Sequence, residues 1–124
     1  MKEYIEDFAM EYYKALDNYD SVEKLLSFFN KDFCIIEGEL VIDSIEKYKS
    51  WYENGNELFV TRLHTFKGFK VTKLEDAYEI EIDMQFEGLK KDNEKIQVEA
   101  IVTWNIVDVN GTFKIKKYEI NLKG

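Results

Sequence analysis

Residues 77–87 alternate between apolar and polar side chains at almost every position. The apolar positions are Tyr78, Ile80, Ile82, Met84 and Phe86. A period of two over this length predicts a strand with one face on a core and the other face in water. An antiparallel sheet with one wet face needs an apolar cover for its other face, and we expect the N-terminal half of the chain to supply it.

The second half of the chain predicts four long strands and no helix. Their expected bounds are 58–74, 77–87, 95–107 and 112–122. Gly68 lies inside the first strand and predicts a bulge or bend there. Asn110-Gly111 is a strong hairpin signal between the last two strands. On the last strand the apolar parity shifts, which predicts a second bulge near Lys116 and Lys117.

The first half predicts three amphipathic helices. Apolar residues recur at three- and four-residue spacing over 3–19, which is typical of a helix with one buried face. Asp20 is expected to cap a second, short helix and Asp43 a third, because an acid follows each of them three residues later. Gly55 is expected to end the third helix in a left-handed conformation. Between the second and third helices we expect two short strands, 33–36 and 40–42.

Together these elements predict an α+β fold in a single domain, residues 1–124. Three N-terminal helices pack on a strongly curved, mainly antiparallel sheet in this prediction. A bent sheet that curls over helices forms a cone, and we expect such a cone to leave a cavity at its open end. The chain has no internal repeat, low-complexity tract or linker that would suggest a second unit.

The charge of the chain narrows the classes of partner. A formal net charge of −8 and the lack of clustered lysines and arginines argue against nucleic acid and against an anionic membrane surface. No apolar run approaches membrane-spanning length and no signal peptide is evident, so we expect a cytoplasmic protein. No zinc-binding spacing or phosphate-binding loop is present, so we expect neither a metal nor a cofactor.

Several stretches of the chain are similar to one known superfamily. They are the helical run YYKALDNYDSVEKLLSFFNKDFCIIEG, the helix DSIEKYKSWY, the strand VTRLHTFKGFKV and the hairpin TWNIVDVNGTFKI. With them, nearly the whole chain resembles the nuclear transport factor 2-like superfamily, which includes SnoaL-like polyketide cyclases and ketosteroid isomerases. The resemblance implies a cone, often in a homodimer, with an apolar pocket between sheet and helices. It implies an isomerase, a cyclase, a dehydratase or a binding-only protein, and the fold alone does not separate these.

The resemblance also implies roles for individual residues. Ketosteroid isomerase-like members use a tyrosine on the first helix, and Tyr12 stands at that position. Glu37 stands where they carry an acid after the first strand. Their second acid falls near Thr103, which cannot act as a protonated carboxylic acid, so a complete oxyanion-holding pair is not expected. His64 stands where many SnoaL-like sequences carry a histidine early on the long strand.

His64 is the single histidine of the chain, and histidine suits proton transfer near neutral pH. Arg62 and Phe66 lie two residues away on either side, so the three share one face of the strand. If that face lines the cavity, His64 and Arg62 beside an aromatic wall would bind an acidic or enolic ligand. The alternative is a histidine on the outer sheet surface or in a dimer contact.

Glu37 follows four apolar residues, so it is a candidate general base at the mouth of an apolar cavity. The alternative is a solvated turn residue. Tyr12 is a candidate hydrogen-bond donor into the pocket, and the alternative is a core tyrosine on the helix stripe. The candidate ligand-contacting residues are Arg62, Phe66, Trp51, Met84, Thr103, Trp104 and Tyr118.

Two functional hypotheses follow. The first is a SnoaL-like protein that binds a small, partly apolar molecule in the cone and catalyses isomerase-, cyclase- or dehydratase-type proton transfer, with Glu37 as base and His64 and Tyr12 as polar partners. The alternative is a non-catalytic ligand-binding or protein-interaction module. In both we expect a homodimer through the outer sheet face, on strand 95–107, where Ile101 and Val107 interrupt polar residues.

Overall fold

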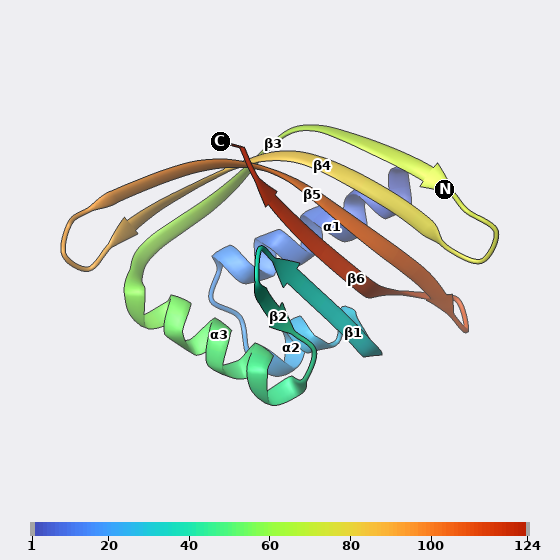
Figure 1. The fold of residues 1–124 in the computed structure, drawn as a ribbon, viewed down its shortest axis with the longest axis horizontal. Coiled ribbons are helices and arrows are strands. Elements are labelled where there is room, and N and C mark those ends of the chain that lie inside the picture. The colour runs from blue at the N-terminus through green and yellow to red at the C-terminus, as the bar shows by residue number, and fades with distance from the viewer. Residues whose placement is uncertain (1, 124) are drawn as a thin grey trace.

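A computed structural model describes residues 2–123, which form one strongly curved six-stranded sheet with three helices on its concave side (Figure 1). The helices are α1 (Lys2–Asp17), α2 (Val22–Leu26) and α3 (Ile45–Leu58). The strands are β1 (Phe29–Glu37), β2 (Leu40–Ile42), β3 (Phe59–Lys73), β4 (Tyr78–Lys90), β5 (Lys95–Val109) and β6 (Thr112–Leu122). This confirms the predicted α+β cone with three N-terminal helices.

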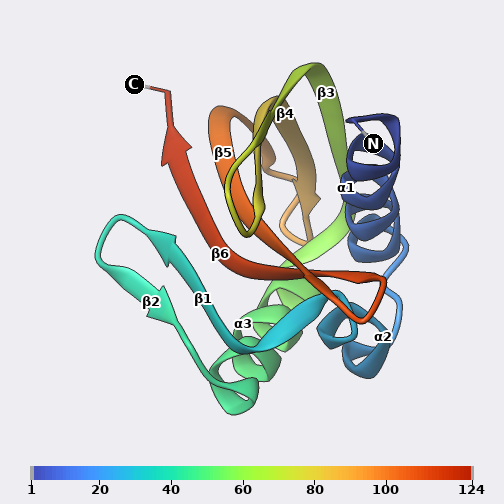
Figure 2. The same ribbon diagram turned by 90° about the vertical axis from the view of Figure 1, so that its right-hand side faces the viewer.

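The strands lie in the order β2-β1-β6-β5-β4-β3, and every neighbouring pair is antiparallel except β1 and β6. In that parallel pair Ile35 is opposite Tyr118 and Glu37 is opposite Ile120. The pairing fixes the end of β1 beside β6, although α3 and four strands separate them in the chain. Figure 2 shows the resulting layer, with the β1–β2 hairpin at one edge and α1 against β3.

The sequence predicted two of the four places where the strand register shifts. The β3–β4 register shifts between Phe66 and Gly68, which is the predicted bulge on the first long strand. The β5–β6 register shifts where Asn105 pairs with Lys117 and the next residue, Ile106, pairs with Ile115. Because each bulge inserts an unpaired residue, it bends the strand and increases its twist, and the sheet curls as a result.

The hairpin between β5 and β6 has the geometry that its sequence predicts. Asn110 and Gly111 have φ values of 55° and 86°. A type I′ turn needs positive φ at both central residues, and asparagine and glycine tolerate it best. This tight turn fixes the register of the two central strands of the sheet.

Two helix caps differ from the prediction. Ser21 and not Asp20 caps α2, and Ser44 and not Asp43 caps α3, each serine oxygen accepting a hydrogen bond from a backbone N–H three residues on. Both serines have the extended backbone that a capping residue needs. The aspartates form ion pairs with lysines one helical turn later instead.

Gly55 does not end the third helix as predicted, because α3 continues to Leu58. The glycine lies inside the helix and takes no left-handed conformation. A Cβ atom at this position would lie 3.4 Å from Nη1 of Arg62. The glycine therefore lies directly beside the guanidinium of an arginine from β3.

The core fills one end of the cone with aromatic rings. Trp104, Tyr12, Tyr13 and Tyr48 are the largest fully buried side chains, and the hydroxyls of Tyr12 and Tyr48 form a hydrogen bond of 2.7 Å. On β4, Ile80 and the alternate positions around it face this core as predicted.

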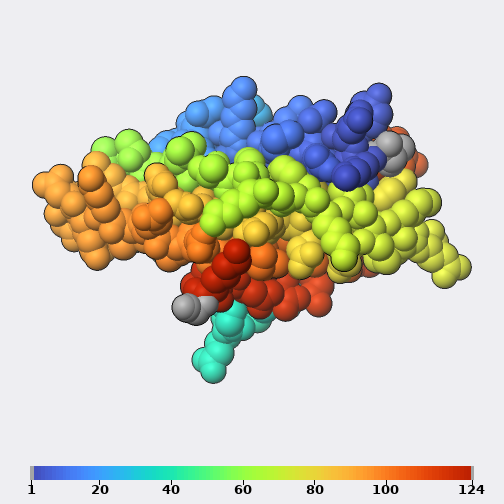
Figure 3. Space-filling view, turned by 90° about the horizontal axis from the view of Figure 1, so that it is seen from above, coloured from blue at the N-terminus to red at the C-terminus, as the bar shows by residue number. Residues whose placement is uncertain are grey.

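The outer face of the sheet is mostly polar, and the tip of the β1–β2 hairpin projects beyond its edge (Figure 3). Ile101 and Val107 are half-buried there within the single chain, and the homodimer stays a prediction. No helix among residues 2–123 has the length and apolar character needed to cross a membrane.

Candidate functional site

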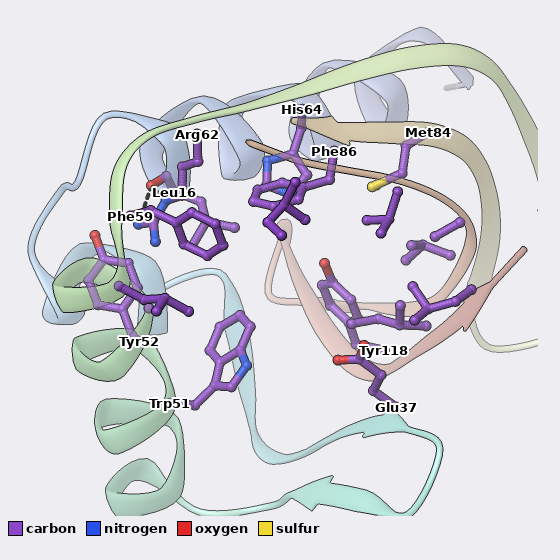
Figure 4. Close-up of a pocket in the computed structure, with 18 of the residues that line it drawn as sticks. Leu16, Glu37, Trp51, Tyr52, Phe59, Arg62, His64, Met84, Phe86 and Tyr118 are labelled. Carbon is purple, nitrogen blue, oxygen red and sulfur yellow. Dashed lines mark hydrogen bonds between the residues drawn. The ribbon is translucent and has the colours of Figure 1, made fainter. Parts of the chain in front are cut away.

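A cavity of about 480 Å³ opens between α3 and the concave face of the sheet (Figure 4). Most of its wall is aliphatic or aromatic, supplied by α3 and by the inner faces of β4, β5 and β6. The charged, hydroxyl and amide groups in the wall come from Glu37, Tyr52, Asn54, Arg62, His64 and Tyr118. An apolar pocket with few polar groups is the usual form of a small-molecule site.

His64 on β3 makes two contacts with one carboxylate at the end of α1. Its ring Nδ1 lies 2.6 Å from Oδ1 of Asp17, and its backbone N–H donates to Oδ2 of the same carboxylate over 2.8 Å. The His64 and Asp17 side chains are only 11% and 13% exposed. Because a carboxylate only accepts, Nδ1 carries a hydrogen in this contact, and the neutral form of the imidazole then has its lone pair on Nε2.

Aromatic rings hold the imidazole in place. The ring of Tyr13 lies 4.8 Å from it and the ring of Phe86 5.0 Å, measured between centroids. Asp17 and these rings contact His64 from two elements, α1 and β4. The imidazole is therefore fixed in position, and it is part of the cavity wall.

Arg62, also on β3, forms hydrogen bonds to the C-terminal end of α1. Its Nε and Nη2 atoms both donate to the backbone oxygen of Leu16, over 3.0 and 2.6 Å. The guanidinium also lies 4.2 Å from the ring centroid of Tyr19 and 5.2 Å from that of Tyr52. A cation at a helix C-terminus is favourable, and so is a cation over an aromatic face. The contact is one residue from Asp17, so Arg62 positions the acid that holds His64.

A second polar pair lies between the cavity and the core. The hydroxyls of Tyr13 and Tyr118 are 2.5 Å apart. Burial raises the pKa of both phenols well above the ordinary value, so both keep their hydrogens over the physiological pH range. Tyr118 is also in the cavity wall, and Figure 4 shows its oxygen directed into the cavity on the side of His64 and Met84.

The structure brings six of the ten predicted site residues together in this wall. They are Glu37, Trp51, Arg62, His64, Met84 and Tyr118. Glu37 has the same strand parity as the buried Ile35 and ends β1 at the cavity. Among residues 2–123 no hydrogen bond or ion pair to its carboxylate is found.

Four predicted site residues lie outside the wall. Tyr12 is fully buried against Tyr48, and Trp104 is fully buried in the core. Phe66 has the inward parity but packs on Tyr13 and Phe69, toward the core end of the cone.

The fourth of these is Thr103, which lies on the outer face of β5. Its neighbours Val102 and Trp104 are buried on the inner face, and side chains alternate along a strand. The partners opposite Thr103 are Glu81 and Glu119, which share that outer face.

The sequence analysis did not identify Asp17 as a site residue. The helical spacing held a signal, because Ala9, Tyr13 and Asp17 follow at four-residue intervals on one face. The first two are buried. Nothing in the local pattern, however, distinguishes Asp17 from the other acids of this helix until β3 is placed beside it.

No protein-family model and no curated protein sequence matches the chain. Solved structures do. A nuclear transport factor 2-like superfamily protein from Salmonella enterica has a TM-score of 0.89 at 13% identity, over 99% of this chain and 91% of that one. A hexachlorocyclohexane dehydrochlorinase from Novosphingobium barchaimii has a TM-score of 0.83 at 17% identity, over 97% and 84%.

A third match is a protein of unknown function with a cystatin-like fold from Nostoc punctiforme, with a TM-score of 0.80 at 17% identity, over 98% and 90% of the two chains. These likenesses define the class of the protein by its architecture. The chain has the nuclear transport factor 2-like fold, as its sequence predicted.

Proposed function

We propose that this protein is an enzyme that removes a proton from carbon in a small, largely apolar substrate, with His64 as the general base. The observation that carries the proposal is the contact of 2.6 Å between Nδ1 of His64 and Oδ1 of Asp17 in the wall of the cavity. A carboxylate that fixes the tautomer of an imidazole also stabilises the imidazolium that forms when the base takes a proton.

The proposed step is an elimination. Nε2 of His64 takes a proton from a carbon of the substrate, and the electron pair of that C–H bond becomes the new double bond. A group on the adjacent carbon leaves with its own bonding pair. The same base supports an isomerisation when the proton returns to another carbon, so elimination and isomerisation share this machinery.

Tyr118 is the proposed hydrogen-bond donor to the substrate. Two hydroxyls joined by one hydrogen bond leave one hydroxyl hydrogen over. Trp104 packs against both phenol rings, but its indole N–H is only a donor and cannot receive this hydrogen. Tyr13 is fully buried, so its hydroxyl hydrogen needs an acceptor inside the protein. Donation from Tyr13 to Tyr118 supplies that acceptor. The hydroxyl of Tyr118 then donates to an oxygen or to a leaving group in the cavity.

Glu37 is the weaker candidate for the base. Its carboxylate lines the cavity but has no orienting contact among the described residues, whereas His64 is held by a carboxylate and two rings. A general base acts best when its geometry is fixed before the substrate arrives. The name of the similar dehydrochlorinase denotes the loss of hydrogen chloride, which is an elimination, and this supports the proposed reaction class.

Deuterium exchange at carbon tests the proposal without knowledge of the natural substrate. The protein is incubated in deuterated buffer with a panel of cyclic ketones, and loss of the C–H signals next to the carbonyl is followed by NMR. We expect wild-type exchange above background, at least about 100-fold slower exchange for Asp17→Asn, and background exchange for His64→Gln.

The control variant is Glu79→Gln on the outer sheet face, which should exchange like the wild type. The absence of exchange on every ketone of the panel, or unchanged exchange in His64→Gln, would contradict the proposal. A dominant loss in Glu37→Gln with His64→Gln unaffected would instead identify Glu37 as the base.

A further inference from the structure

The inner cavity is not the only hollow along α3. A second one, of about 510 Å³, lies between α3 and the edge strand β2. Trp51 and Asn54 are part of the wall of both hollows. The two hollows therefore lie next to each other along α3, with Trp51 and Asn54 at their boundary.

Four of the eight residues that line the outer groove are apolar, and the single chain leaves two of them in water. These two, Leu40 and Val41 of β2, are 47% and 42% exposed. Single exposed apolar residues are common on protein surfaces, but these two lie in a concave groove. The wall of the adjoining cavity also exposes apolar side chains, Leu58 and Leu122.

Helix α3 sets the direction of the groove. The lining residues Asn54, Trp51, Ser50 and Lys47 follow three- and four-residue spacing on α3. Seven residues at 1.5 Å per residue span about 10 Å. That distance corresponds to a medium-length alkyl chain and is longer than the width of a single ring.

We infer that the groove is a subsite for the apolar tail of the ligand whose head occupies the cavity. The ligand class is a molecule with a compact polar head, placed at His64 and Tyr118, and an unbranched alkyl tail that passes Trp51 and lies against Leu40 and Val41. The inference rests on the proposed function only for the position of the head. The groove shares Trp51 and Asn54 with the cavity wall, and this closeness favours a ligand that occupies both over a separate protein partner.

Binding of a graded series of alkylphenols tests the inference. Phenol, 4-propylphenol and 4-hexylphenol are titrated into the protein, and the dissociation constants are measured by calorimetry. A methylene removed from water gains at most about fourfold in affinity. We expect affinity to rise from phenol to propylphenol and to rise again to hexylphenol, because the longer tail reaches the groove.

The decisive variant is Leu40→Asn with Val41→Asn. It should weaken hexylphenol by about tenfold and leave phenol within twofold. The matched control is Leu74→Asn with Val109→Asn, since these residues are 40% and 41% exposed and line neither hollow. The control should leave the whole series unchanged, and thermal melting verifies that both variants are folded.

Three results would overturn the inference. They are no gain from propylphenol to hexylphenol, an equal loss of phenol and hexylphenol affinity in the groove variant, and a change in that variant's sedimentation coefficient, which would mark the groove as a contact between copies. The chain-length series measures binding and needs no catalysis. If the alkylphenol series fails while deuterium exchange is intact, only the tail subsite is refuted. If the series behaves as expected but no deuterium exchange occurs, only the proposed chemistry is refuted.

Discussion

At the scale of single residues, function depends on contacts between groups that the sequence keeps far apart. His64 was a candidate because it is the single histidine, but its role is defined by Asp17, 47 positions earlier. Tyr118 was a candidate as one aromatic among many, and its role follows from the hydroxyl of Tyr13. Residue type identified these candidates, and only the tertiary pairing separates a base or a donor from an ordinary core residue.

The buried tyrosines predict a steep loss of stability at alkaline pH. Burial raises the pKa of Tyr12, Tyr13, Tyr48 and Tyr118 in the folded protein, whereas tyrosines in the unfolded chain ionise near pH 10. Their contribution is therefore complete below pH 10 and is lost as the pH rises toward the folded values. Each tyrosine lowers the free energy of unfolding by about 1.4 kcal/mol per pH unit in that window.

Urea unfolding between pH 9 and 11 measures this slope. The double variant Tyr12→Phe, Tyr48→Phe removes both members of one hydrogen bond, so no buried hydroxyl is left without its partner. We expect the tyrosine-dependent part of the slope to be about half as steep in the variant as in the wild type, because two of the four tyrosines remain. Identical slopes in the variant and the wild type would show that these phenols do not govern alkaline unfolding.

At the scale of elements, the contact between α1 and β3 assembles the site. α1 ends at Asp17. β3 carries Arg62, which donates to the Leu16 carbonyl, and His64, which contacts the side-chain carboxylate of Asp17. Gly55 lies next to the arginine on the side of α3. Three elements therefore meet at Arg62, which sequence analysis had assigned to the ligand.

Replacement of Arg62 should loosen the end of α1. Arg62→Met leaves the Leu16 oxygen without its two side-chain donors, and a hydrogen bond to a charged group contributes about 1.5–3 kcal/mol. We expect a loss of stability in that range by urea unfolding and faster amide exchange at Asn18 and Asp20, whose N–H groups close the last turn of the helix.

Lys70→Met, an exposed site on the same strand, is the matched control and should change neither quantity. Arg62→Lys keeps the charge but cannot make both hydrogen bonds to the Leu16 oxygen. Its stability and its amide exchange rates should therefore lie between those of the wild type and Arg62→Met. Unchanged amide exchange at Asn18 and Asp20 in Arg62→Met would refute the positioning role.

At the scale of the whole molecule, the sequence predicted most of the architecture. Period-two alternation around Ile80, the glycine at position 68 and the Asn110-Gly111 turn are local signals, and each describes the structure correctly. The parallel pairing of β1 with β6 was not predicted, because pairing between distant strands leaves no periodic mark in either of them.

The site was less predictable than the fold for the same reason. Six of the ten expected residues reach the cavity wall because strand parity and the cone shape place inward side chains there. Trp104 shares that parity and Tyr12 lies on the buried face of α1, but both fall at the filled end of the cone. Asp17 needed the position of β3 as well.

The protonation of His64 tests the central claim most directly, and the single histidine makes the measurement unambiguous. Nitrogen-15 NMR of the imidazole reports which ring nitrogen carries the hydrogen in the neutral form. We expect hydrogen on Nδ1 and a bare Nε2 in the wild type, with this preference lost in Asp17→Asn. A wild-type imidazole with hydrogen on Nε2 would contradict the assignment of His64 as the base.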